Sequence, residues 1–122
     1  MTQLSIKRIY EPASPQDGTR ILVDRLWPRG VTKDRVDLWL KDLAPSDALR
    51  HEFHGHPDQW QTFRAAYAAE LGSAPAQAAL AVLRDRIAAG PVTLLYAAKD
   101  ETRNNAEALL LWLDGRADPV QE

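Results

Sequence analysis

Two apolar runs placed on either side of a helical segment most constrain how this chain can fold. Residues 19–26 contain Ile-Leu-Val, and residues 92–98 read Val-Thr-Leu-Leu-Tyr-Ala-Ala. Residues 57–90 lie between the runs and carry apolar side chains at helical spacing. A connection of this length allows parallel strands joined by a right-handed crossover. We therefore predict an α/β fold with a small, mostly parallel sheet flanked by helices in a single three-layer domain.

Weaker patterns predict the elements around these runs. Residues 4–10 read as a short strand, and residues 11–18 hold two prolines and a glycine, which are typical of a loop. Residues 36–43 are ambiguous because both helical and strand spacing fit their apolar side chains. For this segment we favour a short helix stopped by Pro45. Ser46 is then predicted to cap another short helix, which carries Leu49 and Phe53.

Apolar residues on a shared face predict three further helices. The first begins near Pro57, the second ends at Gly90, and the third is capped by Asp100 or Thr102 and ends at Gly115. Their predicted inward-facing residues are Trp60, Phe63, Tyr67 and Leu71 in the first, Leu80, Leu83 and Ile87 in the second, and Ala106, Leu109, Leu110 and Leu113 in the third.

Composition indicates the class of protein. A chain of 122 residues with 45% hydrophobic and 26% charged residues is typical of one globular domain, here with a core over residues 4–114 and a short polar tail. The absence of cysteine excludes disulfides and thiolate chemistry. The N-terminus does not resemble a signal peptide, and no apolar run approaches the ~20 residues that span a bilayer. We therefore expect a cytoplasmic protein with no membrane contact.

The charge of the chain is distributed unevenly. Residues 1–40 carry seven Lys or Arg against five Asp or Glu, whereas residues 41–122 carry eight against twelve, and the whole chain has a net charge of −2. A negative chain without a basic stripe is not expected to bind duplex DNA in general. The excess of cations in the first third still permits a local basic cleft.

Charged residues follow both apolar runs at the point where each strand is expected to end. Asp24 and Arg25 follow the first run, and Lys99 and Asp100 follow the second. In open α/β sheets, ligands bind beyond the carboxyl ends of the strands, where helix N-termini and guanidinium groups attract anions. We therefore predict a cleft for a phosphorylated small molecule, a nucleotide or a nucleic-acid end. Its predicted binding residues are Arg25, Trp27, Arg29, Gly30, Lys99, Asp100, Arg103 and Asn104.

Asp24 is the best candidate for a catalytic acid or base at this cleft, and Trp27 is suited to supply a stacking face. Two alternatives compete with the cleft. The charged residues could brace the sheet, or the Trp-Pro-Arg-Gly segment could dock a partner as part of a non-catalytic interaction module, since Trp and Arg are common interface anchors. Partial burial of Trp27 favours a cleft wall, and exposure favours a docking anchor. The sequence leaves open whether the protein is an enzyme and whether it forms a homo-oligomer.

The three histidines of the chain, His51, His54 and His56, lie within six residues. Their spacing does not fit the zinc-protease helix, and no other His or Cys is available to complete a metal site. We therefore predict no metal and no cofactor, and retain His54 only as a lesser candidate for a proton carrier. Ser46 and Ser73 are predicted to cap helices, and neither a nucleophile elbow nor a Gly-rich phosphate loop occurs.

Four segments together resemble one bacterial family: VDRLWPRG, WLKDLAPS, the predicted helix from Trp60 to Leu71, and LLYAAKD. Over residues 4–114 they are similar to the YeaO-like branch of the domain-of-unknown-function family number 488. The resemblance implies a small α/β fold with a parallel sheet, in which an Asp-Arg pair precedes a Pro-containing turn, and it implies no assigned activity. Asp24, Arg25, Pro28 and Arg29 match that pattern.

The chain departs from this family pattern in three places. Some relatives carry cysteines, and this chain has none, so no thiol mechanism transfers to it. Relatives often read Glu-His-Asn-x-Ala where this chain has Arg103 and Asn104 after a threonine, so the resemblance implies that Arg103 here reinforces anion binding. Relatives also often read Gly-His-Asp at the position of His54-Gly55-His56, which argues against a fixed metal site.

Overall fold

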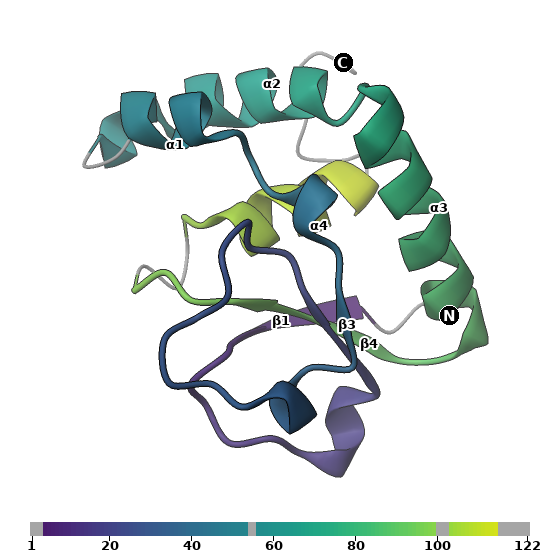
Figure 1. The fold of residues 1–122 in the computed structure, drawn as a ribbon. Coiled ribbons are helices and arrows are strands. Elements are labelled where there is room, and N and C mark those ends of the chain that lie inside the picture. The colour runs from purple at the N-terminus through teal and green to yellow at the C-terminus, as the bar shows by residue number, and fades with distance from the viewer. Residues whose placement is uncertain (1–3, 54–55, 100–102, 115–122) are drawn as a thin grey trace.

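The computed structural model describes residues 4–53, 56–99 and 103–114, and within them one parallel sheet with helices packed against it (Figure 1). The strands are β1 (Leu4–Arg8), β2 (Thr19–Leu22), β3 (Leu38–Trp39) and β4 (Val92–Tyr96). The α-helices are α1 (Asp47–Phe53), α2 (Trp60–Glu70), α3 (Ala74–Ala89) and α4 (Asn105–Asp114). Short 3-10 helices occupy Pro15–Asp17, Lys33–Arg35, Lys41–Leu43 and Pro57–Gln59.

The sheet has the strand order β1-β4-β2-β3, and all its pairings are parallel. Strand β4 lies in the middle, and Leu94 is aligned with Ile6 of β1 on one side and with Ile21 of β2 on the other. All five residues of β4 are buried, as expected for a parallel strand covered on both faces. The α2–α3 segment connects the β3 side of the sheet to this central strand. The prediction of a small α/β domain is therefore confirmed.

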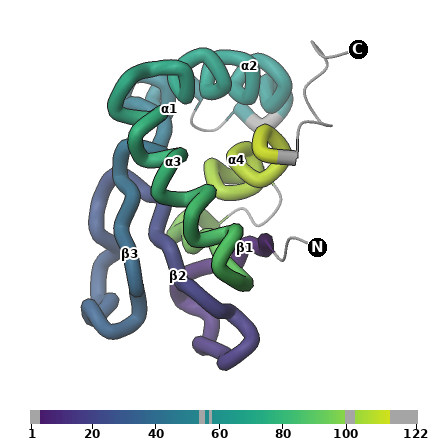
Figure 2. The backbone as a smooth tube through the Cα atoms, turned by 90° about the vertical axis from the view of Figure 1, so that its right-hand side faces the viewer, coloured from purple at the N-terminus to yellow at the C-terminus, as the bar shows by residue number. Residues whose placement is uncertain are grey.

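The two faces of the sheet are covered differently (Figures 1 and 2). On one face, Ile21, Val23 and Leu94 belong to a large apolar cluster with residues of all four α-helices. On the other face, Leu22 and Leu95 form a smaller cluster with side chains from the loops that follow β1 and β2. In the described part of the chain, the third layer therefore consists of loops and 3-10 turns rather than α-helices.

Residues 36–43, for which we favoured a short helix, form β3 and a 3-10 turn instead. Leu38 and Trp39 pair with β2, and the backbone N–H groups of Asp37 and Leu40 donate to carbonyls of β2. The indole N–H of Trp39 also donates to the carbonyl of Asp24 at 2.7 Å. The helix prediction was wrong because hydrogen bonds to a neighbouring strand, which the local pattern does not encode, decided the conformation.

A buried ionic cluster fixes the opposite, amino-terminal end of the sheet. Asp17 accepts from Lys7 at 2.8 Å and from Arg20 at 2.5 Å, and its backbone carbonyl accepts from Thr93 of β4. Burial opposes ionisation of Asp17, but hydrogen bonds from Lys7, the Ser14 N–H and Arg20 together lower its pKa. The charged groups of this cluster are thus engaged with one another within the fold. Among the described residues, no helix has the length and apolar character needed to cross a bilayer.

We predict that Gly18→Ala and Gly30→Ala differ sharply in stability, although both glycines have positive φ angles of 66° and 79°. A Cβ at Gly18 would lie 2.2 Å from the carbonyl oxygen of Pro91, whereas a Cβ at Gly30 would meet nothing within 4 Å. Gly30→Ala is expected to lose ~1 kcal/mol through backbone strain alone, and Gly18→Ala ~3 kcal/mol or more. Urea unfolding of both variants measures the difference, and equal losses would contradict the prediction.

Candidate functional site

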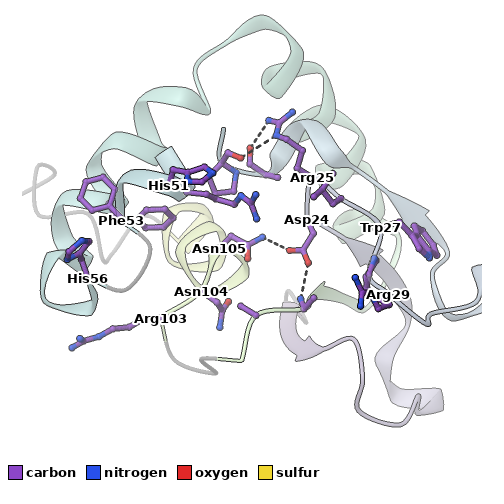
Figure 3. A pocket seen from close by; sticks show the side chains of 18 of the residues that line it. Asp24, Arg25, Trp27, Arg29, His51, Phe53, His56, Arg103, Asn104 and Asn105 are labelled. Carbon is purple, nitrogen blue, oxygen red and sulfur yellow. Dashed lines mark hydrogen bonds between the residues drawn. The ribbon is translucent and has the colours of Figure 1, made fainter. Parts of the chain in front are cut away.

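A cleft of about 740 Å³ opens at the carboxyl ends of the central strands (Figure 3). Its lining combines the segment after β2, the loop after β4, the start of α4 and the adjoining ends of α1 and α2. The volume falls within the range of ~300–1,000 Å³ typical of small-molecule sites. The polar and aromatic side chains of the lining include those of Asp24, Arg25, Trp27, Arg29, Arg50, His51, Phe53, His56, Trp60, Phe63, Arg103, Asn104 and Asn105.

Asp24 connects three elements at the floor of the cleft. One oxygen of its carboxylate accepts the backbone N–H of Ala97, just after β4, at 2.9 Å. The other accepts the side-chain amide of Asn105, in α4, at 3.0 Å, and that amide also donates to the carbonyl of Val23 at 2.9 Å. Figure 3 shows Asp24 and Asn105 pointing toward one another in the middle of the cleft. The carboxylate therefore joins the ends of β2 and β4 to the last helix.

Burial raises the pKa of the Asp24 carboxyl above its usual value of 3.8, and it outweighs three opposing influences. These are the hydrogen bonds from Asn105 and Ala97 and the positive charge of Arg50. A raised pKa is compatible with proton transfer. Both carboxylate oxygens already accept hydrogen bonds from the protein, so Asp24 also has a structural role in holding the segment after β4 and α4 together.

The two predicted arginines of the segment after β2 have different environments. The Arg25 side chain donates to the carbonyls of Ala44 and Pro45, at 3.3 and 3.4 Å, and so supports the loop before α1. The Arg29 side chain is exposed, and its guanidinium makes no hydrogen bond or ion pair with the residues that the structure describes. Both side chains line the cleft, but only Arg29 has its donors uncommitted within this described set.

The Trp-Pro-Arg-Gly segment is rigid around Arg29. The Trp27 ring is half-buried, its indole N–H donates to the carbonyl of Val31 at 2.8 Å, and it contacts Trp39 edge to face at a centroid distance of 5.4 Å. The N–H of Val31 donates to Pro28, which closes a tight turn with Gly30 at the position that favours a positive φ. Gly30, a predicted binding residue, does not line the cleft. Its positive φ instead shapes the turn that presents Arg29.

Helix α1 supplies the facing wall, and its start is fixed by a hydrogen-bond network. The predicted cap is confirmed: the Ser46 hydroxyl oxygen accepts the N–H of Leu49 at 3.1 Å. Glu70 of α2 in turn accepts from both the N–H and the hydroxyl of Ser46, at 2.9 and 2.6 Å. This network orients the last turn of α1, from which Arg50, His51 and Phe53 line the cleft.

Aromatic rings continue this wall from α1 into α2. Phe53 meets Phe63 edge to face at 5.9 Å, and Trp60 stacks on Phe63 at 5.7 Å with an interplanar angle of 18°. Phe63 also stacks on Tyr67, which is fully buried and donates its hydroxyl proton to the carbonyl of Leu43. The predicted inward-facing stripe of α2 is present, and its outer end forms part of the cleft.

The segment after β4 contributes only part of what was predicted. Arg103 is exposed and lines the cleft, and Asn104 is buried beside it. Asn104 accepts the N–H of Glu107 at 2.8 Å, so this residue caps α4. Asp100, a predicted binding residue, and Thr102, the alternative to Asp100 as the predicted cap, lie outside the described residues. Lys99 is exposed and does not line the cleft.

Two of the three histidines, His51 and His56, line the cleft and are exposed, whereas His54 lies outside the described residues. Within residues 4–53, 56–99 and 103–114, no group of three His, Cys, Asp or Glu side chains is arranged to hold a metal ion. His51 and His56 therefore line the cleft as separate imidazoles and not as part of a metal-binding group among the described residues.

Comparison with known proteins places this chain in a family. A family model described as the inactive DUF488-N3 subclade matches residues 3–122. The chain belongs to this subclade. The resemblance to the YeaO-like branch is therefore confirmed.

Relatives of the subclade member described here include three uncharacterised proteins. Uncharacterized protein YeaO of Escherichia coli K12 is 46% identical over 112 residues, which cover 90% of this chain and 96% of YeaO. Uncharacterized proteins Rv3073c of Mycobacterium tuberculosis H37Rv and Mb3100c of Mycobacterium bovis are each 41% identical over 117 residues, 94% of this chain and 97% of theirs. No solved structure matches the chain.

Sequence reasoning about this DUF488-N3 chain missed the wall formed by α1 and α2. Phe53 was assigned to a short helix, and Trp60 and Phe63 to an inward-facing stripe. His51 was considered only as a metal ligand, and Arg50 was given no role. One signal was available, since Arg50 and Phe53 are three residues apart and share a helix face. Asn105 was missed because its role depends on how α4 docks against the end of β2.

Asn105→Ala is expected to destabilise the protein by ~1–3 kcal/mol and to raise the pKa of Asp24 further, because it removes a donor from the carboxylate and from Val23. The folded protein holds the Asp24 proton more tightly than the unfolded chain, so this carboxyl lowers stability as the pH rises from 3.8 through its raised pKa. The variant should widen the pH range over which this loss of stability occurs, because it raises the upper limit, the pKa of Asp24 in the folded protein. Urea unfolding across pH and carboxyl NMR titration measure both effects; the exposed Gln61→Ala should change neither.

Arg25→Ala is expected to destabilise the protein by ~1 kcal/mol, because the guanidinium supports two carbonyls of the loop before α1. Arg29→Ala should leave the unfolding midpoint unchanged, since its side chain makes no such bonds with described residues. Parallel denaturant titrations of the two variants test this division. Equal midpoints for both variants would show that Arg25 does not brace the loop.

Proposed function

We propose that this protein binds a small phosphorylated ligand, such as a nucleotide, a sugar phosphate or a nucleic-acid end, in the cleft at the carboxyl ends of the strands. The observation that carries the proposal is the exposed Arg29 guanidinium, presented by a rigid turn at the rim of a cleft. Guanidinium groups bind phosphate through paired hydrogen bonds, and Arg29 has these donors available among the described residues.

The charge of the lining supports an anionic ligand. Four arginines line the cleft, and Asp24 is the only acidic side chain among the described lining residues. The whole chain has a net charge of −2, so this concentration of cations is local. Positive charge concentrated in a concave site raises the local concentration of anions. The four lining arginines are Arg25, Arg29, Arg50 and Arg103.

Binding fits the described groups better than catalysis does. Asp24, the predicted acid or base, has both oxygens engaged by Ala97 and Asn105. Ser46 and Ser73 accept backbone N–H groups at helix starts, so neither hydroxyl is placed as a nucleophile. The description of the subclade as inactive agrees with a ligand-binding role. The half-burial of Trp27 favours the cleft wall over the docking anchor that the alternative requires.

Arg29→Ala is expected to weaken binding of a phosphorylated ligand by about tenfold or more, since a hydrogen bond to a charged group is worth ~1.5–3 kcal/mol. Isothermal titration calorimetry with inorganic phosphate, pyrophosphate, ribose 5-phosphate and nucleoside monophosphates measures the change. Arg86→Ala removes the same charge from an exposed position of α3 outside the cleft and should bind like wild type. The proposal fails if no probe binds wild type, or if Arg29→Ala binds as tightly.

A further inference from the structure

Resting on the proposed function, we infer that the ligand is a mononucleotide whose base stacks on the aromatic wall formed by Phe53, Trp60 and Phe63. These three rings line the cleft and are half-buried, and each packs against the main core cluster. Figure 3 shows Phe53 and His56 on one side of the cleft and Trp27 and Arg29 on the other. The cleft therefore offers an apolar surface across from the Arg29 guanidinium, whose donors are uncommitted among the described residues.

Core packing accounts for only part of the aromatic stripe on α2. Tyr67, at the inner end, is 1% exposed and has its hydroxyl bonded to Leu43. Trp60 and Phe63 precede it on the same helix face, yet both remain partly exposed at the cleft. An apolar surface that faces water is unfavourable, and a flat ring placed on it removes that surface from water. Aromatic side chains stack on nucleobases of any sequence for this reason.

Cationic groups lie next to this wall. Arg50 and Phe53 are three residues apart in α1, so they share a helix face, and both line the cleft. Arg103 lines the same cleft from the segment before α4. A ligand that combines a flat ring with a phosphate satisfies both surfaces at once. A sugar phosphate has no aromatic face, and inorganic phosphate leaves the wall in water.

The charge of the chain favours a mononucleotide over a nucleic-acid end. Binding of a polynucleotide relies on a basic track that follows several phosphates. The wall comes from residues 41–122, which carry eight cationic and twelve acidic residues. Among the described lining residues, Arg50 and Arg103 are the arginines on the side of α1 and α4, and two cations match one phosphate group better than a run of several phosphates.

Calorimetry with wild-type protein tests the inference without any substitution. A nucleoside monophosphate such as AMP or UMP is expected to bind about tenfold or more tightly than ribose 5-phosphate, which carries the phosphate and the sugar but no base. Equal affinities would overturn the inference and leave the proposed function standing, whereas failure of these two probes and of phosphate and pyrophosphate to bind would refute both. A short single-stranded oligonucleotide that binds more tightly than the monophosphate would also overturn it.

Substitution of the wall should abolish this preference. Trp60→Leu and Phe53→Leu keep an apolar side chain for the core but remove the ring, so AMP should lose about tenfold in affinity while ribose 5-phosphate is unaffected. Trp112→Leu removes a partly buried tryptophan outside the cleft and should keep the preference. Retention of the preference in both wall variants would contradict base stacking. Melting temperatures measured without ligand identify any variant that fails to fold. If a wall variant does not fold, the comparison of the nucleoside monophosphate with ribose 5-phosphate on wild-type protein decides the question.

Discussion

The carboxylate of Asp24 is the interaction on which the architecture of the cleft depends. It is drawn out of water at the end of a buried strand, which is unfavourable for a charged group. Hydrogen bonds from Ala97, in the segment after β4, and from Asn105, in α4, offset part of this cost. A single side chain therefore joins the segments that follow two strands to the first residue of the last helix.

The arginines around this junction illustrate how one residue type serves two purposes. Arg25 is directed at the carbonyls of Ala44 and Pro45 and so contributes to the path of the chain into α1. Arg29, four residues later, is held by a turn that the indole of Trp27 and the ring of Pro28 make rigid. Arg25 therefore braces the loop, and Arg29 faces the open volume. Lys99, predicted as a binding residue, stays outside that volume.

Features that depend on the local pattern of apolar and capping residues could be predicted from the sequence. The buried central strand, the Ser46 cap and the aromatic stripe of α2 follow from apolar spacing and from capping chemistry, and all are present. Contacts between distant segments were beyond such patterns. The pairing of β3 with β2 overrode an apparent helical period at residues 36–43, and the meeting of Asn105 with Asp24 joins positions 81 residues apart. For the same reason the half of the cleft contributed by α1 and α2 was not foreseen.

The aromatic ladder from Trp60 through Phe63 to Tyr67 has a consequence for how related sequences are read. Because Tyr67, at its inner end, belongs to the core and stacks on Phe63, selection for stability alone would preserve that end of the ladder even in a lineage that no longer used the cleft. Arg29 is under no such constraint from the described contacts. Across the subclade, an arginine retained at that position while its neighbours vary would indicate that a ligand is still recognised. Loss of that arginine beside a retained Tyr67 would indicate a pocket that is no longer used.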